Sequence, residues 1–415
     1  MDARLRRDVA WNLVPIALLG AVGLGMNFAI ARWWGAEALA IFNLVTITYF
    51  VLAVVGACGL QYAVLRAVAE RPDDRDHVAG AVVGALVPNL GLAAAATAIF
   101  LALRGPLAHL HGSAEVARGI GWAAPGLFAF SINKVLFGLV NGLRRMRAFA
   151  IYTSLRYLAI AAGLVAAHAF AWPPAVVWSI AEGAMLAVLA VELACTVSLA
   201  HGAGWRGWTR RHLAYGTRGV VATLGYELHT KLDVWMLGAS GIAKSTVGVY
   251  SLGAALAEGA TQLAVAVANN LNPIVARELA AGRPAEVEAL AKRTRRWFVP
   301  AFAGACALGA AAYPLVIPRL VGAQFAAGAV PFAILMVGLA LASPYLPFSQ
   351  VLLMGDRPGW HTVLIVVVVA INAGAQLVLI PLLGAPGAAC AMACAVVSSA
   401  LLVRSLAKVR VGVHL

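Results

Sequence analysis

Eight ionisable side chains stand inside stretches of sequence that are otherwise apolar. These residues are Lys134, Arg156, Glu182, Glu192, Glu227, Lys231, Asp233 and Glu258. A charge at the centre of a lipid bilayer costs roughly 2.5 to 3.5 kcal/mol on insertion scales, so all of them facing lipid would be prohibitive. We therefore expect them to line an interior surface that water reaches, or to pair with one another.

The cations and the acids among these residues suit different chemistry. A guanidinium group can bind a phosphate with two hydrogen bonds, and a lysine ammonium group is a movable point charge. A buried carboxylate can carry a proton or coordinate a cation, although a locally satisfied polar contact is the more frequent role. Glu227 precedes Lys231 by four residues, the favoured order for an ion pair within a helix, so a structural pair is the alternative there.

The elements that carry these residues are predicted to be membrane-spanning helices. Of the 415 residues 62% are hydrophobic and 12% are charged, whereas soluble domains have roughly 45 to 50% apolar and 25% charged residues. Apolar stretches of membrane-spanning length alternate with short basic clusters. We predict about twelve spans: Val9–Ala31, Leu39–Val64, Val78–Leu103, Ile120–Leu143, Phe149–Phe170, Ala175–Ala200, Leu213–Ser240, Val247–Val275, Trp297–Leu320, Val330–Met354, His361–Leu383 and Ala388–Lys408.

The distribution of Lys and Arg predicts the orientation of these spans. With the N-terminus in the cytoplasm, 23 of the 31 basic residues fall in cytoplasmic connections and tails, and 5 fall in external ones. This bias follows the positive-inside rule and places both termini in the cytoplasm. Because the net charge of +14 gathers in these connections, we expect no nucleic-acid partner.

Motifs for cofactors and catalysis are missing from the sequence. Gly238–Ser245 resembles a phosphate-binding loop, but Ala243 occupies the position of the required second glycine. The five cysteines lie inside apolar spans and suggest neither a disulfide framework nor a metal site. We expect no cofactor and no enzymatic activity.

Two weak internal similarities divide the chain into halves. Ile41–Leu44 resembles Val249–Leu252, and Asn141–Arg144 resembles Met354–Arg357, each about 210 residues further on. They predict an N-terminal lobe of six helices over residues 1–205 and a C-terminal lobe over 206–415. Prolines such as Pro344 interrupt several spans, where they predict kinks that act as hinges or as static bends.

Several short motifs resemble the Wzx-type polysaccharide flippases, a family within the superfamily of multidrug, oligosaccharidyl-lipid and polysaccharide exporters. The motifs are Tyr215-Gly216, Asp233–Gly238, Val247–Leu252, Asn272–Arg277, Gly59-Leu60 followed by Arg66, and Asn141-Gly142. The resemblance implies an all-α membrane fold of two six-helix lobes, related by a pseudo-two-fold axis, around a central cavity. It also implies the cytoplasmic (inner) membrane as the location.

The resemblance implies that the cargo is an oligosaccharide linked to a polyprenyl pyrophosphate, moved to the outer leaflet for cell-surface polysaccharide biosynthesis by alternating access. The other partners that we expect are membrane lipids, a coupling proton or Na⁺, and a polysaccharide polymerase. The candidate cations for binding the anionic headgroup are Lys134, Arg156, Lys231, Arg66 and Arg32. The candidate coupling acids are Asp233, Glu227, Glu258, Glu182 and Glu192.

Two other functions compete with this prediction. A cation-coupled multidrug antiporter of the same superfamily would suit an acidic cavity, and five of the eight buried charges are acids. A membrane-embedded glycan polymerase or ligase would need catalytic residues in extended external segments. The predicted external connections are short, which argues against such an enzyme.

Overall fold

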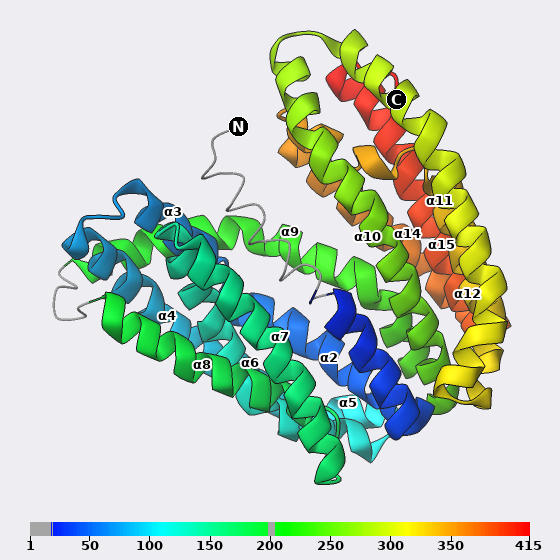
Figure 1. Ribbon diagram of the computed structural model, residues 1–415, viewed down its shortest axis with the longest axis horizontal. Coiled ribbons are helices and arrows are strands. Elements are labelled where there is room, and N and C mark those ends of the chain that lie inside the picture. The colour runs from blue at the N-terminus through cyan, green and yellow to red at the C-terminus, as the bar shows by residue number, and fades with distance from the viewer. Residues whose placement is uncertain (1–17, 19, 198–203) are drawn as a thin grey trace. The chain divides into compact units, whose positions relative to one another are not determined.

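Helices make up nearly all of the chain in the computed structural model, which describes residue 18, residues 20–197 and residues 204–415 (Figure 1). Ten of the described helices are long and apolar enough to cross a membrane. The protein therefore has an all-α, multi-pass membrane fold, as predicted. The described part of the chain contains no strand.

Two of the twelve predicted spans are not among these ten. The first, Val9–Ala31, lies partly outside the described residues, and residues 20–33 are helical. The seventh corresponds to α9, Trp205–Ala239, whose apolar part carries Glu227, Lys231 and Asp233. The total of twelve spans thus stays a prediction.

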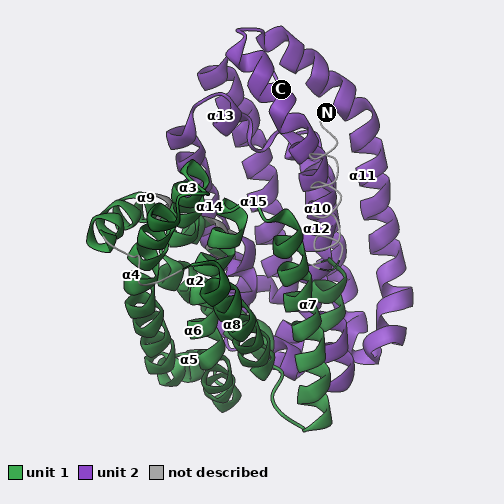
Figure 2. Cartoon of the chain, turned by 60° about the vertical axis from the view of Figure 1, so that its left-hand side comes forward, with its two compact units in different colours: residues 1–26, 41–227 green, residues 27–40, 228–415 purple. Residues whose placement is uncertain are grey.

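Contacts divide the chain into two compact units, shown in different colours in Figure 2. Unit 1 holds Met1–Met26 and Ile41–Glu227, and unit 2 holds Asn27–Ala40 and Leu228–Leu415. The lobe boundary predicted between residues 205 and 206 stays a prediction.

Unit 1 is built around helix α6, which contacts α3, α4, α5 and α8. Its helices are α2 (Gly35–Ala57, from Ile41 onward), α3 (Leu60–Glu70), α4 (Arg75–Ala102), α5 (Arg104–Leu110), α6 (Ala114–Gly142), α7 (Met146–Ala169), α8 (Val176–Thr196) and the first part of α9. Helix α7 packs on α8. The helices α6, α7 and α8, which carry charged residues, are therefore neighbours.

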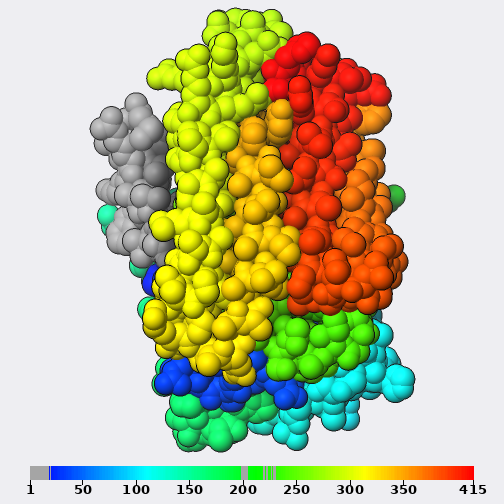
Figure 3. All heavy atoms as spheres, turned by 90° about the vertical axis from the view of Figure 1, so that its right-hand side faces the viewer, coloured from blue at the N-terminus to red at the C-terminus, as the bar shows by residue number. Residues whose placement is uncertain are grey.

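In unit 2, helix α12 packs between α11 and α15, and α14 packs on α15. Figure 3 shows α11, α12 and α15 side by side on one face of this unit. The elements are α10 (Lys244–Ala280), α11 (Pro284–Val321), η2 (Ala323–Gly328), α12 (Ala329–Ala342), η3 (Leu346–Phe348), α13 (Val351–Met354), α14 (Pro358–Leu383), α15 (Ala385–Leu406) and the π-helical turn η4 (Ala407–Val411).

Two of the predicted spans are broken into shorter helices. The second divides into α2 and α3 at Cys58 and Gly59, whose φ angles of 46° and 70° are left-handed. The tenth divides into α12, η3 and α13, because the ring nitrogens of Pro344 and Pro347 cannot donate hydrogen bonds. Tight bonds from Tyr345 N to Ala342 O, at 3.0 Å, and from Phe348 N to Tyr345 O, at 2.9 Å, replace the α-helical pattern there.

Candidate functional site

Helices α6, α7 and α8 of unit 1 bring three of the predicted charged residues together. Lys134 comes from α6, Arg156 from α7 and Glu182 from α8. We call these residues, with Asn133 and Phe130 of α6, the Lys134–Arg156 cluster. All five lie in helices that are candidate membrane spans.

Close packing between α6 and α8 positions the cluster. A β-carbon at Gly126 would lie 2.5 Å from the carbonyl carbon of Trp178, so only glycine permits this approach of the two helices. Next to Pro125, the Ser179 hydroxyl accepts a hydrogen bond from Gly126 N at 2.9 Å and donates one to Trp122 O at 2.6 Å. The proline in α6 is thus part of a fixed contact with α8.

Glu182 is fully buried, and its carboxylate is held by two side chains. Its Oε1 lies 2.7 Å from Arg156 Nε and 2.5 Å from Arg156 Nη2. Asn133 Nδ2 donates to Glu182 Oε2 at 3.0 Å and to the Glu182 backbone oxygen at 2.9 Å. A buried charge needs this kind of compensation, which the Arg156 guanidinium and the Asn133 amide provide.

Lys134 and Arg156 both lie over the ring of Phe130. The Lys134 Nζ and the Arg156 Cζ are each 4.7 Å from the ring centroid. Among the described residues, no carboxylate oxygen lies within 4.0 Å of Lys134 Nζ. Glu182 pairs directly with Arg156, whereas Glu227 and Glu182 act on the charge of Lys134 only from beyond 4.0 Å. The five residues of the Lys134–Arg156 cluster therefore keep one formal positive charge, and that charge can bind an anion.

Aromatic side chains surround the cluster on its α2 side. The Tyr49 ring stacks on Phe130 with centroids 5.8 Å apart and on Trp178 with centroids 5.4 Å apart. Trp178 Nε1 donates to Thr46 Oγ1 at 3.0 Å, and the buried Tyr49 hydroxyl has no hydrogen-bond partner among the described residues. Asn133, Phe130 and Tyr49 were not among the predicted site residues; a polar Asn133 directly before Lys134 in an apolar span was the one available signal.

Unit 2 contains a second pair of opposite charges and a buried carboxylate. Lys231 of α9 pairs with Glu258 of α10, with side chains 35% and 45% exposed. Lys231 thus forms an ion pair with Glu258 of α10. The alternative predicted from spacing, a pair of Lys231 with Glu227 in the same helix, is not the one that forms. Asp233 is buried, accepts a hydrogen bond from Tyr250 Oη at 2.6 Å, and leaves its Oδ1 without a partner among the described residues.

The other predicted site residues make different contacts. Arg66 is exposed on α3, 3.4 Å from Glu70 and 5.7 Å over the Tyr215 ring. Arg32 is exposed and falls in unit 2. Glu192, near the end of α8, pairs with Arg145 at 2.6 Å and accepts from Tyr152 Oη at 2.9 Å. Glu227, the last residue of unit 1 in the sequence, is partly buried, and its charge acts on Lys134.

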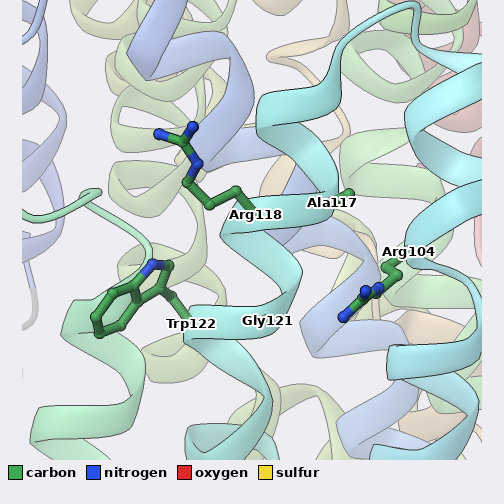
Figure 4. Close-up of a pocket in the computed structure, with 5 residues that line it drawn as sticks. All are labelled: Arg104, Ala117, Arg118, Gly121 and Trp122. Atoms are coloured by element: carbon green, nitrogen blue, oxygen red, sulfur yellow. The ribbon is translucent and has the colours of Figure 1, made fainter.

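A hollow of about 330 Å³ lies at the other end of α6. Arg104 of α5 and Ala117, Arg118, Gly121 and Trp122 of α6 line it, and Arg118 and Trp122 project from the same side of the helix (Figure 4). Arg118 already pairs with Glu115 at 3.2 Å. No motif of the sequence predicted this hollow.

A protein-family model described as polysaccharide biosynthesis protein matches residues 5–277, about two thirds of the chain. The chain belongs to this family. A search of curated protein sequences finds no match.

Solved structures with the same fold come from the MATE and MurJ transporters. An inward-facing MATE transporter of the MOP superfamily superposes with a TM-score of 0.77 at 15% identity, over 97% of this chain and 98% of the other. The lipid II flippase MurJ gives a TM-score of 0.72 at 14% identity, over 96% and 87%. A Pyrococcus furiosus MOP transporter, described as having a binding pocket of reverse polarity, gives 0.62 at 14% identity, over 98% and 95%. This polysaccharide biosynthesis protein therefore has the fold of that superfamily.

In this member of the family, several of the short motifs that resemble Wzx-type flippases contact one another. A β-carbon at Gly216 would lie 2.0 Å from Cys58 O, and one at Gly59 would lie 2.8 Å from Gly216 Cα. Tyr250 of one motif donates to Asp233 of another. The family motifs thus include contacts that hold helices together within each unit.

Proposed function

We propose that this protein is a transporter that moves an oligosaccharide linked to a polyprenyl pyrophosphate from the cytoplasmic to the outer leaflet. The observation that carries the proposal is the Lys134–Arg156 cluster, a net cationic site within apolar helices of unit 1. Membership of the polysaccharide biosynthesis family supports this cargo. The likeness to a lipid II flippase supports a lipid-linked substrate.

In the proposed mechanism, the cluster binds the pyrophosphate while the polyprenyl tail stays in lipid. Arg156 is held in place by Glu182 and can offer its remaining N–H groups, and Lys134 approaches as a second, movable charge. Further positions that bind the headgroup during transport are Lys231, Arg66 and Arg32. No covalent bond changes, so the protein needs no cofactor and is not an enzyme.

The transport cycle that we propose is alternating access between two six-helix lobes, residues 1–205 and 206–415. Twelve spans with both termini in the cytoplasm, in the inner membrane, suit the distribution of basic residues. A proton or Na⁺ is the proposed coupling ion. Asp233 is the foremost candidate acid because its Oδ1 is buried without a partner among the described residues; Glu227, Glu258, Glu182 and Glu192 follow. A polysaccharide polymerase is the proposed partner that receives the product.

A cation-coupled multidrug antiporter is the second candidate function. The high structural likeness to a MATE transporter and the acids among the buried charges favour it. The two candidates differ in the charge of the cargo that the Lys134–Arg156 cluster would meet. A glycan polymerase or ligase is the third and least supported alternative.

Reconstitution into liposomes distinguishes these functions. The flippase predicts that a fluorescent polyprenyl-pyrophosphate saccharide becomes accessible at the opposite leaflet only when the protein is present. The antiporter predicts that ethidium-like cations are moved across the same vesicles under an ion gradient. Movement of the cation without exposure of the saccharide would reject our proposal.

A further inference from the structure

The broken tenth span places an aromatic side chain between two arginines in unit 2. Arg295 Cζ of α11 lies 4.9 Å from the centroid of the Tyr345 ring, and Arg404 Cζ of α15 lies 5.9 Å from it. Arg295 Nε also donates to Pro344 O at 3.1 Å, a carbonyl in the segment between α12 and η3. The break between α12 and η3 therefore supplies both the ring and the carbonyl that hold Arg295.

These two guanidinium groups lack a counter-ion. No carboxylate oxygen lies within 4.0 Å of either one among the described residues, and Arg295 Nη2 is buried without a hydrogen-bond partner. Two acids at this end of unit 2 are engaged elsewhere: Glu278 pairs with Arg277 and Arg283, and Glu288 accepts from His414 N. Two like charges that share one ring repel each other, so an anion bound between them would be stabilising.

An apolar face leads away from the two arginines along α12 and α15. Its exposed residues include Leu341, four positions before Tyr345, and Leu401, three positions before Arg404. Val330 and Val337 continue this face on α12, and Leu308 and Leu315 are exposed on α11. From Val330 to Leu341 the helix rises about 16 Å, which is about half of the roughly 30 Å hydrocarbon core of a bilayer. Acyl chains of one leaflet fit that length.

We propose that Arg295, Tyr345 and Arg404 form a binding site for the phosphate of an anionic phospholipid from the bilayer. The phosphate would lie between the two guanidinium groups, and the acyl chains would follow the apolar face of α12 and α15. A phosphocholine headgroup would bind less well, because the two arginines repel its tethered ammonium group. This site is separate from the Lys134–Arg156 cluster and does not depend on the proposed cargo.

Native mass spectrometry of the purified full-length protein tests the site, with phosphatidylglycerol and phosphatidylcholine of equal acyl length as probes. R295Q/R404Q should weaken phosphatidylglycerol binding by at least about tenfold, since two charge-assisted contacts are lost. Phosphatidylcholine should bind weakly to every variant. The matched control is R293Q/R296Q, which removes two positive charges from exposed positions of α11 beside Arg295. It should change phosphatidylglycerol binding by less than about twofold.

Three further results decide the proposal. R404Q alone, at an exposed position, should fold like the unaltered protein on size-exclusion chromatography and still weaken phosphatidylglycerol binding. Equal losses in R293Q/R296Q and R295Q/R404Q would overturn the site, because they would indicate attraction by net charge alone. Displacement of phosphatidylglycerol by an equimolar polyprenyl pyrophosphate, or by inorganic phosphate, would overturn the assignment to a bilayer phospholipid.

Discussion

At the scale of single residues, Glu182 and Arg156 form an ion pair of unit 1, the one among its described residues in which the acid is 0% exposed. Asn133 completes the hydrogen bonds of that carboxylate. A pair of this kind can serve stability, binding or both. Substitutions that separate these roles are therefore informative.

Replacing Glu182 alone should destabilise the protein. E182L leaves the Arg156 charge buried and unpaired, which we expect to cost about 3 to 5 kcal/mol and to lower the thermal unfolding midpoint in detergent. The double variant E182L/R156M removes both charges and should recover most of that loss. If the double variant is as unstable as E182L, the buried pair does not explain the stability of this region.

Lys134 should matter for transport and little for stability. K134Q removes the cation of the Lys134–Arg156 cluster that has no carboxylate oxygen within 4.0 Å among the described residues. We expect saccharide exposure in liposomes to slow by about tenfold or more, the effect of losing one charged contact. The control K292Q, at an exposed position of α11, should transport normally. Unchanged transport by K134Q would remove the main support for the proposed binding site.

At the scale of helices, glycine contacts and helix breaks decide which faces meet. Gly216 in α9 lies against Cys58 at the α2–α3 break, with no room for a β-carbon. Gly207, nine residues earlier in α9, has no atom within 4 Å of the position of a β-carbon. The two positions offer a matched comparison within one helix.

G216A should prevent the packing of α9 against the α2–α3 break. Because the added carbon would lie 2.0 Å from Cys58 O, the backbones must separate, and we expect a loss of at least about 3 kcal/mol or no folded protein. G207A should be neutral or stabilising by up to about 1 kcal/mol, since alanine favours helix. Similar yields and unfolding midpoints for both variants would contradict this account of the close contact.

At the scale of the whole molecule, the asymmetry of basic residues predicts the topology. The connection between α10 and α11 belongs to the end of unit 2 that is rich in arginine, and the connection between α9 and α10 belongs to the opposite end. The positive-inside rule places the first in the cytoplasm. Exposed positions in both connections allow a direct test.

Cysteine labelling in intact cells tests that orientation. S240C, between α9 and α10, should react with a membrane-impermeant maleimide from outside, whereas A281C, between α10 and α11, should react only after permeabilisation. Both residues are exposed, so accessibility to water is matched. The opposite labelling pattern would invert the proposed direction of transport. The unaltered protein, in which Cys195 and Cys394 are exposed, provides the background signal.

The sequence by itself determined the membrane class, the approximate spans and the charged residues of the Lys134–Arg156 cluster. Apolar length and charge distribution are local properties, and the cost of a charge in lipid marks Lys134, Arg156 and Glu182 without any knowledge of the fold. Proline positions also predicted an interruption of the tenth span, although not its division into α12, η3 and α13.

Only the tertiary structure decided which of these residues meet. Arg156 could pair with any of several acids, and the packing of α7 on α8 selects Glu182. Lys231 pairs with Glu258 because the neighbouring helix α10 brings that carboxylate to it. The alternative predicted from the sequence was Glu227, one turn earlier in α9. Helix periodicity specifies the face on which a side chain lies, but its partner depends on which other helix covers that face, and that depends on contacts such as Gly126 against Trp178.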